Sequence, residues 1–100
     1  MAMADVVVKG SWINVLDEKG KEISTMSSSG IELLGVGNGF FVAKKGSWIN
    51  VYDEKCKEIS TMSASGLEFR SAVGSTFTCK KGSWINTYDI KCKEVGTRPA

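Results

Sequence analysis

Apolar and polar residues alternate in short runs along this chain. In the run Trp-Ile-Asn-Val-Tyr at 48–52, an extended strand would place Ile and Val on one face and Trp, Asn and Tyr on the other. The runs at 40–44, 58–62 and 67–73 are also short, β-prone and bounded by Gly, Ser and Lys. No segment keeps the i, i+3, i+4, i+7 apolar spacing of a helix. The pattern predicts an all-β fold.

The pattern recurs with a fixed period. The phrase Gly-Ser-Trp-Ile-Asn begins at residues 10, 46 and 82, a spacing of 36 residues, and residues 10–45 match 46–81 at 22 of 36 positions. Such a period is typical of repeat proteins, in which each unit buries its apolar faces against the next. We expect one β-repeat domain over 1–100, built from antiparallel four-stranded units at about 1–30, 31–66 and 67–100.

Each unit contains a predicted hairpin turn and a predicted central strand. Residues 53–57 read as the turn, and its counterpart at 17–21 has Gly20 where a left-handed backbone fits. Both faces of the strand at 48–52 are largely apolar, which predicts that neighbouring sheets cover it on both sides, as in propeller blades.

Two family resemblances bear on the architecture. Residues 41–48 followed by 53–59 resemble the WG-type β-repeat and the third-strand hairpin of WD-type propeller blades. The segment between Gly46 and Asp53 is about one residue longer than in either pattern, and the WD-type Gly-His pair is missing. This resemblance implies a propeller-like ring and transfers no binding residue.

The chain is also similar to the β-prism of monocot mannose-binding lectins, which implies three sheets around a threefold axis in a monomer. The sugar motif of that family, Gln-x-Asp-x-Asn-x-Val-x-Tyr, is absent. The aligned positions before Tyr52 hold Lys44, Gly46, Trp48 and Asn50.

The propeller reading predicts self-association. The chain starts and stops inside a repeat and supplies eleven predicted strands, with one inner strand absent from the first unit. Because propellers close with about four blades or more, we expect a homodimer that forms a six-bladed ring and buries the apolar faces of both terminal sheets.

Composition narrows the functional classes. The chain is 42% apolar and 24% charged, as in ordinary globular domains, and its net charge of +2 disfavours nucleic acid as a partner. It has no apolar run of the roughly 18–20 residues that span a bilayer, and no secretory signal is visible. We expect no membrane association.

The cysteines predict a reducing, cytoplasmic location. Cys56 and Cys92 are equivalent positions of successive units, so they should lie at least one sheet spacing of about 10 Å apart, which is beyond disulfide reach. Cys79 reads as a small core residue, so all three thiols are expected to be free. With no histidine and no Cys-x-x-Cys pair, we expect no zinc site and no cofactor.

A tryptophan and an asparagine recur on the central strand of every unit. We expect them in the structural core, with the asparagines hydrogen-bonded. The alternatives are that the tryptophans stack on sugars or bases and that the asparagines contact a ligand. These residues are Trp12, Trp48 and Trp84, together with Asn14, Asn50 and Asn86.

A lysine- and serine-rich rim is the candidate ligand site. In an up-and-down sheet the Lys-Gly turns share one end with the Ser-rich loops, which gathers hydrogen-bond donors for a small anion or a carbohydrate. The alternative is that the lysines only keep the turns soluble. The rim residues are Lys44, Lys45, Lys80, Lys81, Ser29 and Ser65.

No catalytic constellation is visible. The serines have no histidine partner, and Glu32 and Glu68 alternate with apolar residues without a nearby carboxylate. We therefore expect a non-enzymatic assembly and binding module. A small lectin-like or anion-binding protein and a purely structural protein remain the alternatives.

Overall fold

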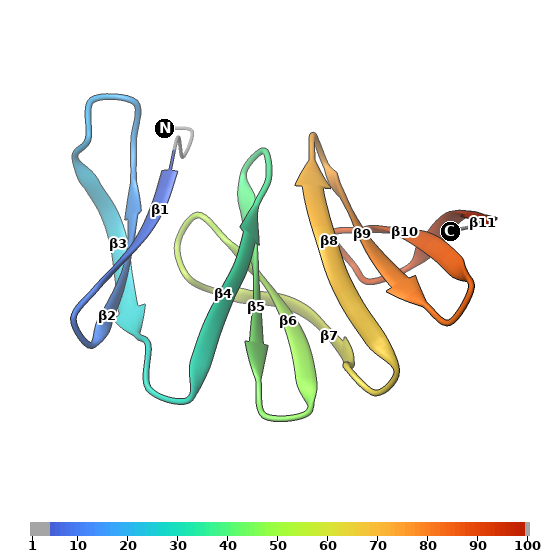
Figure 1. Ribbon diagram of the computed structural model, residues 1–100. Helices are drawn as coiled ribbons and strands as arrows, with labels where there is room; N and C mark the ends of the chain where they lie inside the picture. Colours follow the sequence, from blue (N-terminus) through green and yellow to red (C-terminus); the bar gives the residue numbers. More distant parts are fainter. Residues whose placement is uncertain (1–4, 100) are drawn as a thin grey trace.

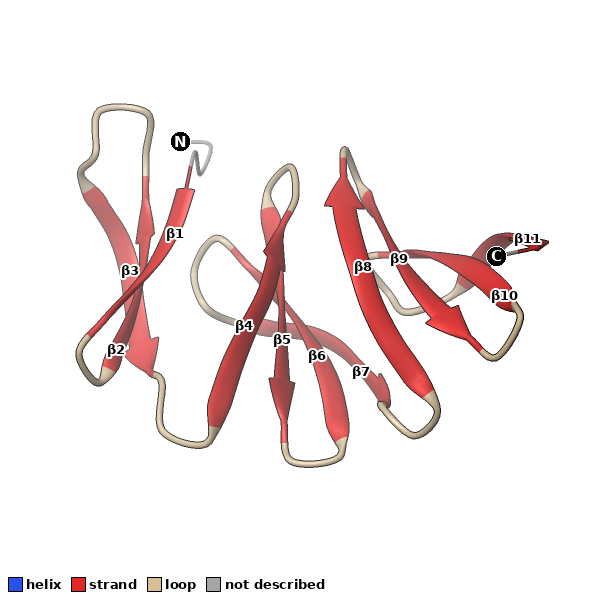
Figure 2. Ribbon diagram, viewed as in Figure 1, coloured by secondary structure: helices blue, strands red, loops and turns tan. Residues whose placement is uncertain are grey.

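The computed structural model describes residues 5–99, which form eleven strands in three antiparallel sheets and contain no helix (Figures 1 and 2). The all-β prediction is confirmed. The first sheet holds β1 (Asp5–Lys9), β2 (Trp12–Leu16) and β3 (Glu22–Ser27). The second holds β4 (Ile31–Val36), β5 (Phe40–Lys45), β6 (Trp48–Asp53) and β7 (Glu58–Ser63). The third holds β8 (Leu67–Val73), β9 (Thr76–Lys81), β10 (Trp84–Asp89) and β11 (Glu94–Pro99).

The hairpin turns follow from local chemistry. The Oδ1 atom of Asp53 accepts hydrogen bonds from the backbone N–H groups of Lys55 at 2.8 Å and Lys57 at 3.0 Å, which fixes the turn between β6 and β7. The turn needs one left-handed residue, and Gly20 meets this need in the first sheet with a φ of 77°. Cys56 and Cys92 adopt the same conformation with a φ of 61°, at a cost of about 1–2 kcal/mol each.

The three sheets stand side by side in an arc, and the edge strands β4 of the second sheet and β8 of the third sheet are neighbours (Figure 1). Buried apolar side chains form two clusters, one in each space between successive sheets. The first cluster is Val6, Ile13 and Val15 against Phe41, Ala43 and Tyr52. The second is Phe40, Val42, Ile49 and Val51 against Phe77, Cys79 and Tyr88. The second sheet is thus covered on both faces, and the single enclosed core of a three-sided prism is not what residues 5–99 form.

A serine hydroxyl ties each sheet to the next. Ser24 Oγ donates to the backbone oxygen of Glu54 at 2.6 Å and lies 3.3 Å from Cys56 Sγ. One repeat later, Ser60 Oγ donates to the backbone oxygen of Ile90 at 2.6 Å and lies 3.2 Å from the sulfur of Cys92. These inter-sheet serine contacts give the packing between successive sheets a directional component that apolar burial lacks.

The outer face of the third sheet differs from the expectation of an apolar terminal face. Three threonines replace the apolar residues that the second sheet presents to its neighbour, and every residue of β11 is exposed. The replacements are Thr76 for Phe40, Thr78 for Val42 and Thr87 for Val51. The six-bladed homodimer stays a prediction. A junction between two chains that used this face would be more polar than the two interfaces between sheets within one chain.

Candidate ligand pockets on the three sheets

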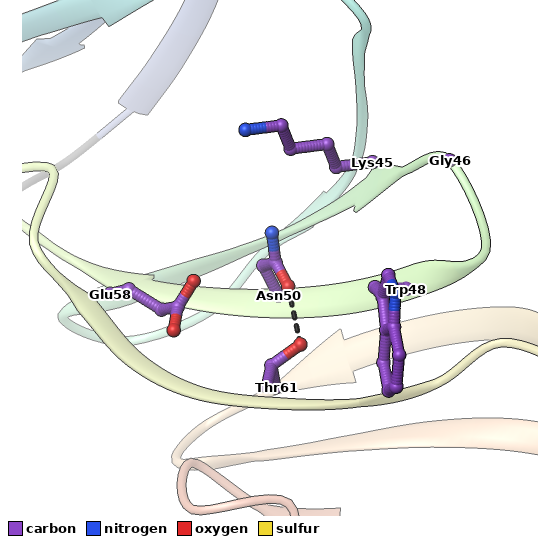
Figure 3. Close-up of a pocket in the computed structure, with 6 residues that line it drawn as sticks. All are labelled: Lys45, Gly46, Trp48, Asn50, Glu58 and Thr61. Atoms are coloured by element: carbon purple, nitrogen blue, oxygen red, sulfur yellow. Dashed lines mark hydrogen bonds between the residues drawn. The ribbon is translucent and has the colours of Figure 1, made fainter.

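The same pocket occurs once on each sheet. On the second sheet it has a volume of about 480 Å³ and lies over β5, β6 and β7 (Figure 3). Its lining residues are Lys45, Gly46, Trp48, Asn50, Glu58 and Thr61. The first sheet repeats it with Lys9, Trp12, Asn14, Glu22 and Thr25 in about 500 Å³, and the third with Lys81, Trp84, Asn86 and Thr97 in about 510 Å³. Three equivalent pockets therefore follow the 36-residue period.

The tryptophans form the walls of these pockets, and the prediction that they belong to the core is wrong. Trp12, Trp48 and Trp84 are 53%, 54% and 52% exposed. Each begins its strand beside the Lys-Gly turn, and the residues that line its pocket all come from its own sheet. For Trp48 and Trp84 the neighbouring sheet therefore leaves the indole open, whereas Trp12 lies on the outer face of the first sheet, opposite the face whose Ile13 and Val15 pack against the second sheet.

The asparagines are the polar floor of the pockets. Asn50 and Asn86 are buried, as predicted, with 5% and 7% exposure, whereas Asn14 is only partly buried. The hydroxyl of Thr61 donates to Asn50 Oδ1 at 2.6 Å, and Asn50 Nδ2 donates to the hydroxyl of Tyr52 at 3.1 Å (Figure 3 shows the first contact). The threonine hydroxyl on the amide oxygen and the tyrosine hydroxyl on the amide nitrogen together fix the orientation of the Asn50 side chain.

The third sheet repeats this network, and the first sheet keeps part of it. Thr97 donates to Asn86 Oδ1 at 2.7 Å, and Asn86 Nδ2 donates to the hydroxyl of Tyr88 at 3.2 Å. Thr25 donates to Asn14 at 2.7 Å, but Leu16 occupies the tyrosine position. The amide of Asn14 therefore has no tyrosine hydroxyl on its own strand to donate to.

Stacked aromatic rings hold the floor from one side. Tyr52 stacks on Phe41 with ring centroids 5.1 Å apart, and Tyr88 stacks on Phe77 at 5.4 Å. Such stacking fixes the tyrosine hydroxyl that accepts from the asparagine. The second and third pockets are therefore preorganised by contacts that do not involve a ligand.

The predicted lysine–serine rim does not converge on one site. Lys45 and Lys81 line tryptophan pockets, whereas Lys44 lies opposite Glu32 and Lys80 opposite Glu68 in the strand register. Successive side chains on a strand point to opposite faces, so the paired lysines diverge. The rim serines, Ser29 and Ser65, direct their backbone N–H groups to the hydroxyls of Ser27 and Ser63 at 3.2 Å.

A separate charged groove lies between β4 of the second sheet and β8 of the third sheet. It has a volume of about 640 Å³, and its polar lining combines Glu32, Lys44, Glu68 and Arg70. The two carboxylates and two cations offset one another, so the groove has no strong preference for an ion of either sign. Sequence reasoning did not single out Arg70, whose counterpart in the second sheet is Leu34.

The cysteines are free, which confirms the prediction of unpaired thiols. Burial raises the pKa of the Cys79 thiol to about 11 and also raises the pKa values of Cys56 and Cys92. All three are therefore protonated near neutral pH, whereas a nucleophilic cysteine must be a thiolate.

Sequence reasoning missed the carboxylates and threonines of the pockets. Glu22 and Glu58 are equivalent, and so are Thr25, Thr61 and Thr97. These glutamates and threonines recur on the strand that pairs with the asparagine-bearing strand, and this recurrence was the signal in the sequence that could have found them.

No protein-family model matches this chain, and no curated protein matches it. Within residues 5–99 there is no helix of the length and apolarity needed to cross a membrane. The pockets therefore have to be interpreted from their own chemistry.

Proposed function

We propose that this chain is a non-enzymatic, multivalent carbohydrate-binding module with one site on each sheet. The observation that carries the proposal is the threefold occurrence of a half-exposed tryptophan beside an anchored asparagine. A purely structural repeat protein would gain stability by covering these indole faces, because burial of apolar surface contributes about 25 cal/mol per Å².

The chemistry of each pocket suits a sugar ring. A pyranose has one face of C–H groups that packs on an indole, and its hydroxyls both donate and accept hydrogen bonds. In the second pocket, the side-chain amide of Asn50 and the ammonium of Lys45 supply donor groups, and the carboxylate of Glu58 is an acceptor. The carboxylate disfavours a small anion, so a neutral sugar fits this set best.

The repetition favours polymeric or clustered ligands. Each site offers one indole and a few polar groups, so binding at a single site is expected to be weak. Linked sites act at a high effective concentration, which raises avidity by a factor of about 10² or more when the geometry permits simultaneous binding.

The test is a glycan array followed by calorimetric titration of the ligand that binds. We expect binding that changes little with salt, and progressive loss of avidity in Trp48→Ala and in the triple Trp→Ala variant. The matched control is Val73→Ala, because Val73 is apolar, 72% exposed and outside the three pockets. Binding that survives the triple variant, or the absence of any binding glycan, would contradict the proposal.

The same titrations distinguish the anion-binding alternative from the carbohydrate proposal. Salt-sensitive binding that is lost in the Lys44→Gln/Lys80→Gln variant and kept in the tryptophan variants would indicate an anion site on the rim. That outcome would replace the carbohydrate proposal.

A further inference from the structure

The charged groove between β4 and β8 is a second kind of pocket in this molecule. Its volume of about 640 Å³ exceeds that of each tryptophan pocket, and its lining residues all lie between positions 32 and 70. β4 and β8 are neighbouring edge strands of two sheets whose other strands are all described (Figure 1). The groove is therefore defined by contacts inside the chain, and it is independent of the tryptophan pockets.

Apolar side chains from both sheets make up much of the lining. They are Leu33, Leu34 and Ile49 of the second sheet, Leu67 and Phe69 of β8, and Ala64 of the connection that precedes β8. All of these are buried or partly buried. Such a lining favours a ligand with apolar groups of its own, because their burial removes apolar surface from water.

The charged side chains of the groove balance one another without pairing. Glu32 and Lys44 come from the second sheet, and Glu68 and Arg70 come from β8. No ion pair joins any of these four side chains to another among residues 5–99. A ligand with a single charge would be attracted by two of them and repelled by the other two, whereas a zwitterion can satisfy both kinds at once. The lining therefore favours a ligand that carries both an ammonium and a carboxylate.

Arg70 is the position where this groove departs from the repeat. It is the extra residue of a β-bulge in β8, because the pairing with β9 shifts register between Phe69 and Ser71. The same bulge in β4 holds Leu34, which packs against the second core cluster, whereas Arg70 is exposed. A planar guanidinium can donate two parallel hydrogen bonds to a carboxylate, which a leucine cannot do. The departure therefore adds a carboxylate-binding group to the groove.

We infer that the groove binds a short apolar peptide with free termini, with the peptide carboxylate at Arg70 and the peptide ammonium at Glu32. These two side chains belong to different sheets, and stacked sheets are about 10 Å apart. An extended peptide rises about 3.3 Å per residue, so about three residues span that distance. The apolar side chains of the peptide would then contact the leucines and Phe69 of the lining.

The first arm of the test changes only the ligand. Titration of the ¹⁵N-labelled chain with the tripeptide Ala-Phe-Ala, followed by NMR, should shift the backbone amide signals of the groove. The N-acetylated tripeptide lacks the ammonium and the C-terminally amidated tripeptide lacks the carboxylate, so each should bind about fivefold more weakly. The indole N–H signals of the three tryptophans report on the other pockets and should not shift. Because the protein is unaltered, this arm does not depend on the folding of a variant.

The second arm assigns each peptide terminus to a side chain. Arg70→Leu introduces the residue that the second sheet holds at the same bulge, so the fold should be retained. In this variant the free and the amidated peptide should bind equally, because the partner of the carboxylate is gone. Glu32→Gln should in the same way abolish the difference between the free and the acetylated peptide. The matched controls are Arg98→Leu and Glu18→Gln, which change exposed residues outside the groove and should leave both differences intact.

Four outcomes would overturn the inference. The first is the absence of binding at millimolar peptide concentration. The second is that the acetylated or the amidated peptide binds as tightly as the free one. The third is a difference between the free and the amidated peptide that persists in Arg70→Leu. The fourth is that the shifts are confined to the indole N–H signals, which would place the peptide in the tryptophan pockets.

Discussion

The inter-sheet serine contacts should be worth a measurable part of the folding free energy. Ser60 lies on β7 and donates across the space between the second and third sheets to the backbone oxygen of Ile90 at 2.6 Å. Its oxygen is also 3.2 Å from the sulfur of Cys92. Replacing Ser60 with Ala removes the hydroxyl and leaves a partly buried carbonyl without this donor.

The magnitude follows from that geometry. A partly buried acceptor that loses its partner costs about 1–3 kcal/mol, and partial access to water places Ser60→Ala near 1–2 kcal/mol. With a urea m-value of about 1 kcal/mol/M for a domain of this size, the midpoint should fall by about 1–2 M. The m-value itself should not change, because the surface exposed on unfolding is the same.

Equilibrium urea unfolding followed by tryptophan fluorescence measures this effect. Ser24→Ala tests the equivalent contact at the first junction, where the hydroxyl donates to Glu54 at 2.6 Å, and should give a similar loss. Ser63→Ala is the control, since its hydroxyl accepts from the N–H of Ser65 in an exposed loop, and should cost under about 0.5 kcal/mol. If Ser60→Ala costs no more than Ser63→Ala, the contact does not stabilise the junction.

Three further predictions follow from the packing. Trp48→Ala should cost about 1–2 kcal/mol in urea unfolding because the ring is half exposed, against about 3–5 kcal/mol for the fully buried Phe41→Ala; equal losses would return the tryptophan to the core. Gly35→Ala should destabilise by about 1–3 kcal/mol, because a Cβ atom there would lie 2.6 Å from Cζ of Phe69, and Phe69→Leu should relieve most of this loss. Because the pKa of Cys79 is raised in the folded protein, the thiol of the unfolded chain ionises first as the pH rises. The free energy of unfolding should therefore be full below about pH 9 and decline toward about pH 11. Cys79→Ala should reduce this decline, and an unchanged dependence of stability on pH would contradict the assignment.

The sequence alone determined the local structure of this protein. Alternating apolar and polar residues set the strands, and turn-forming Asp, Lys and Gly residues set where they end. Both the tendency to form a strand and the left-handed position of a hairpin turn depend on a few adjacent residues. The left-handed position predicted at Gly20 holds in all three sheets, although cysteine occupies it twice. The free thiols followed from the one-repeat separation of Cys56 and Cys92.

Only the tertiary structure decided which part of an apolar face is covered. Trp48 and Tyr52 share one face of β6, yet Tyr52 is 6% exposed and Trp48 is 54% exposed. Alternation assigns a side chain to a face, but the neighbouring sheet determines how far along the strand that face is buried. Tyr52 packs in the cluster between the first two sheets, whereas the indole of Trp48 lies at the other end of the strand, beside the open pocket. The contrast between core and candidate binding site therefore depends on contacts between residues about 30 or more positions apart, which no local pattern records.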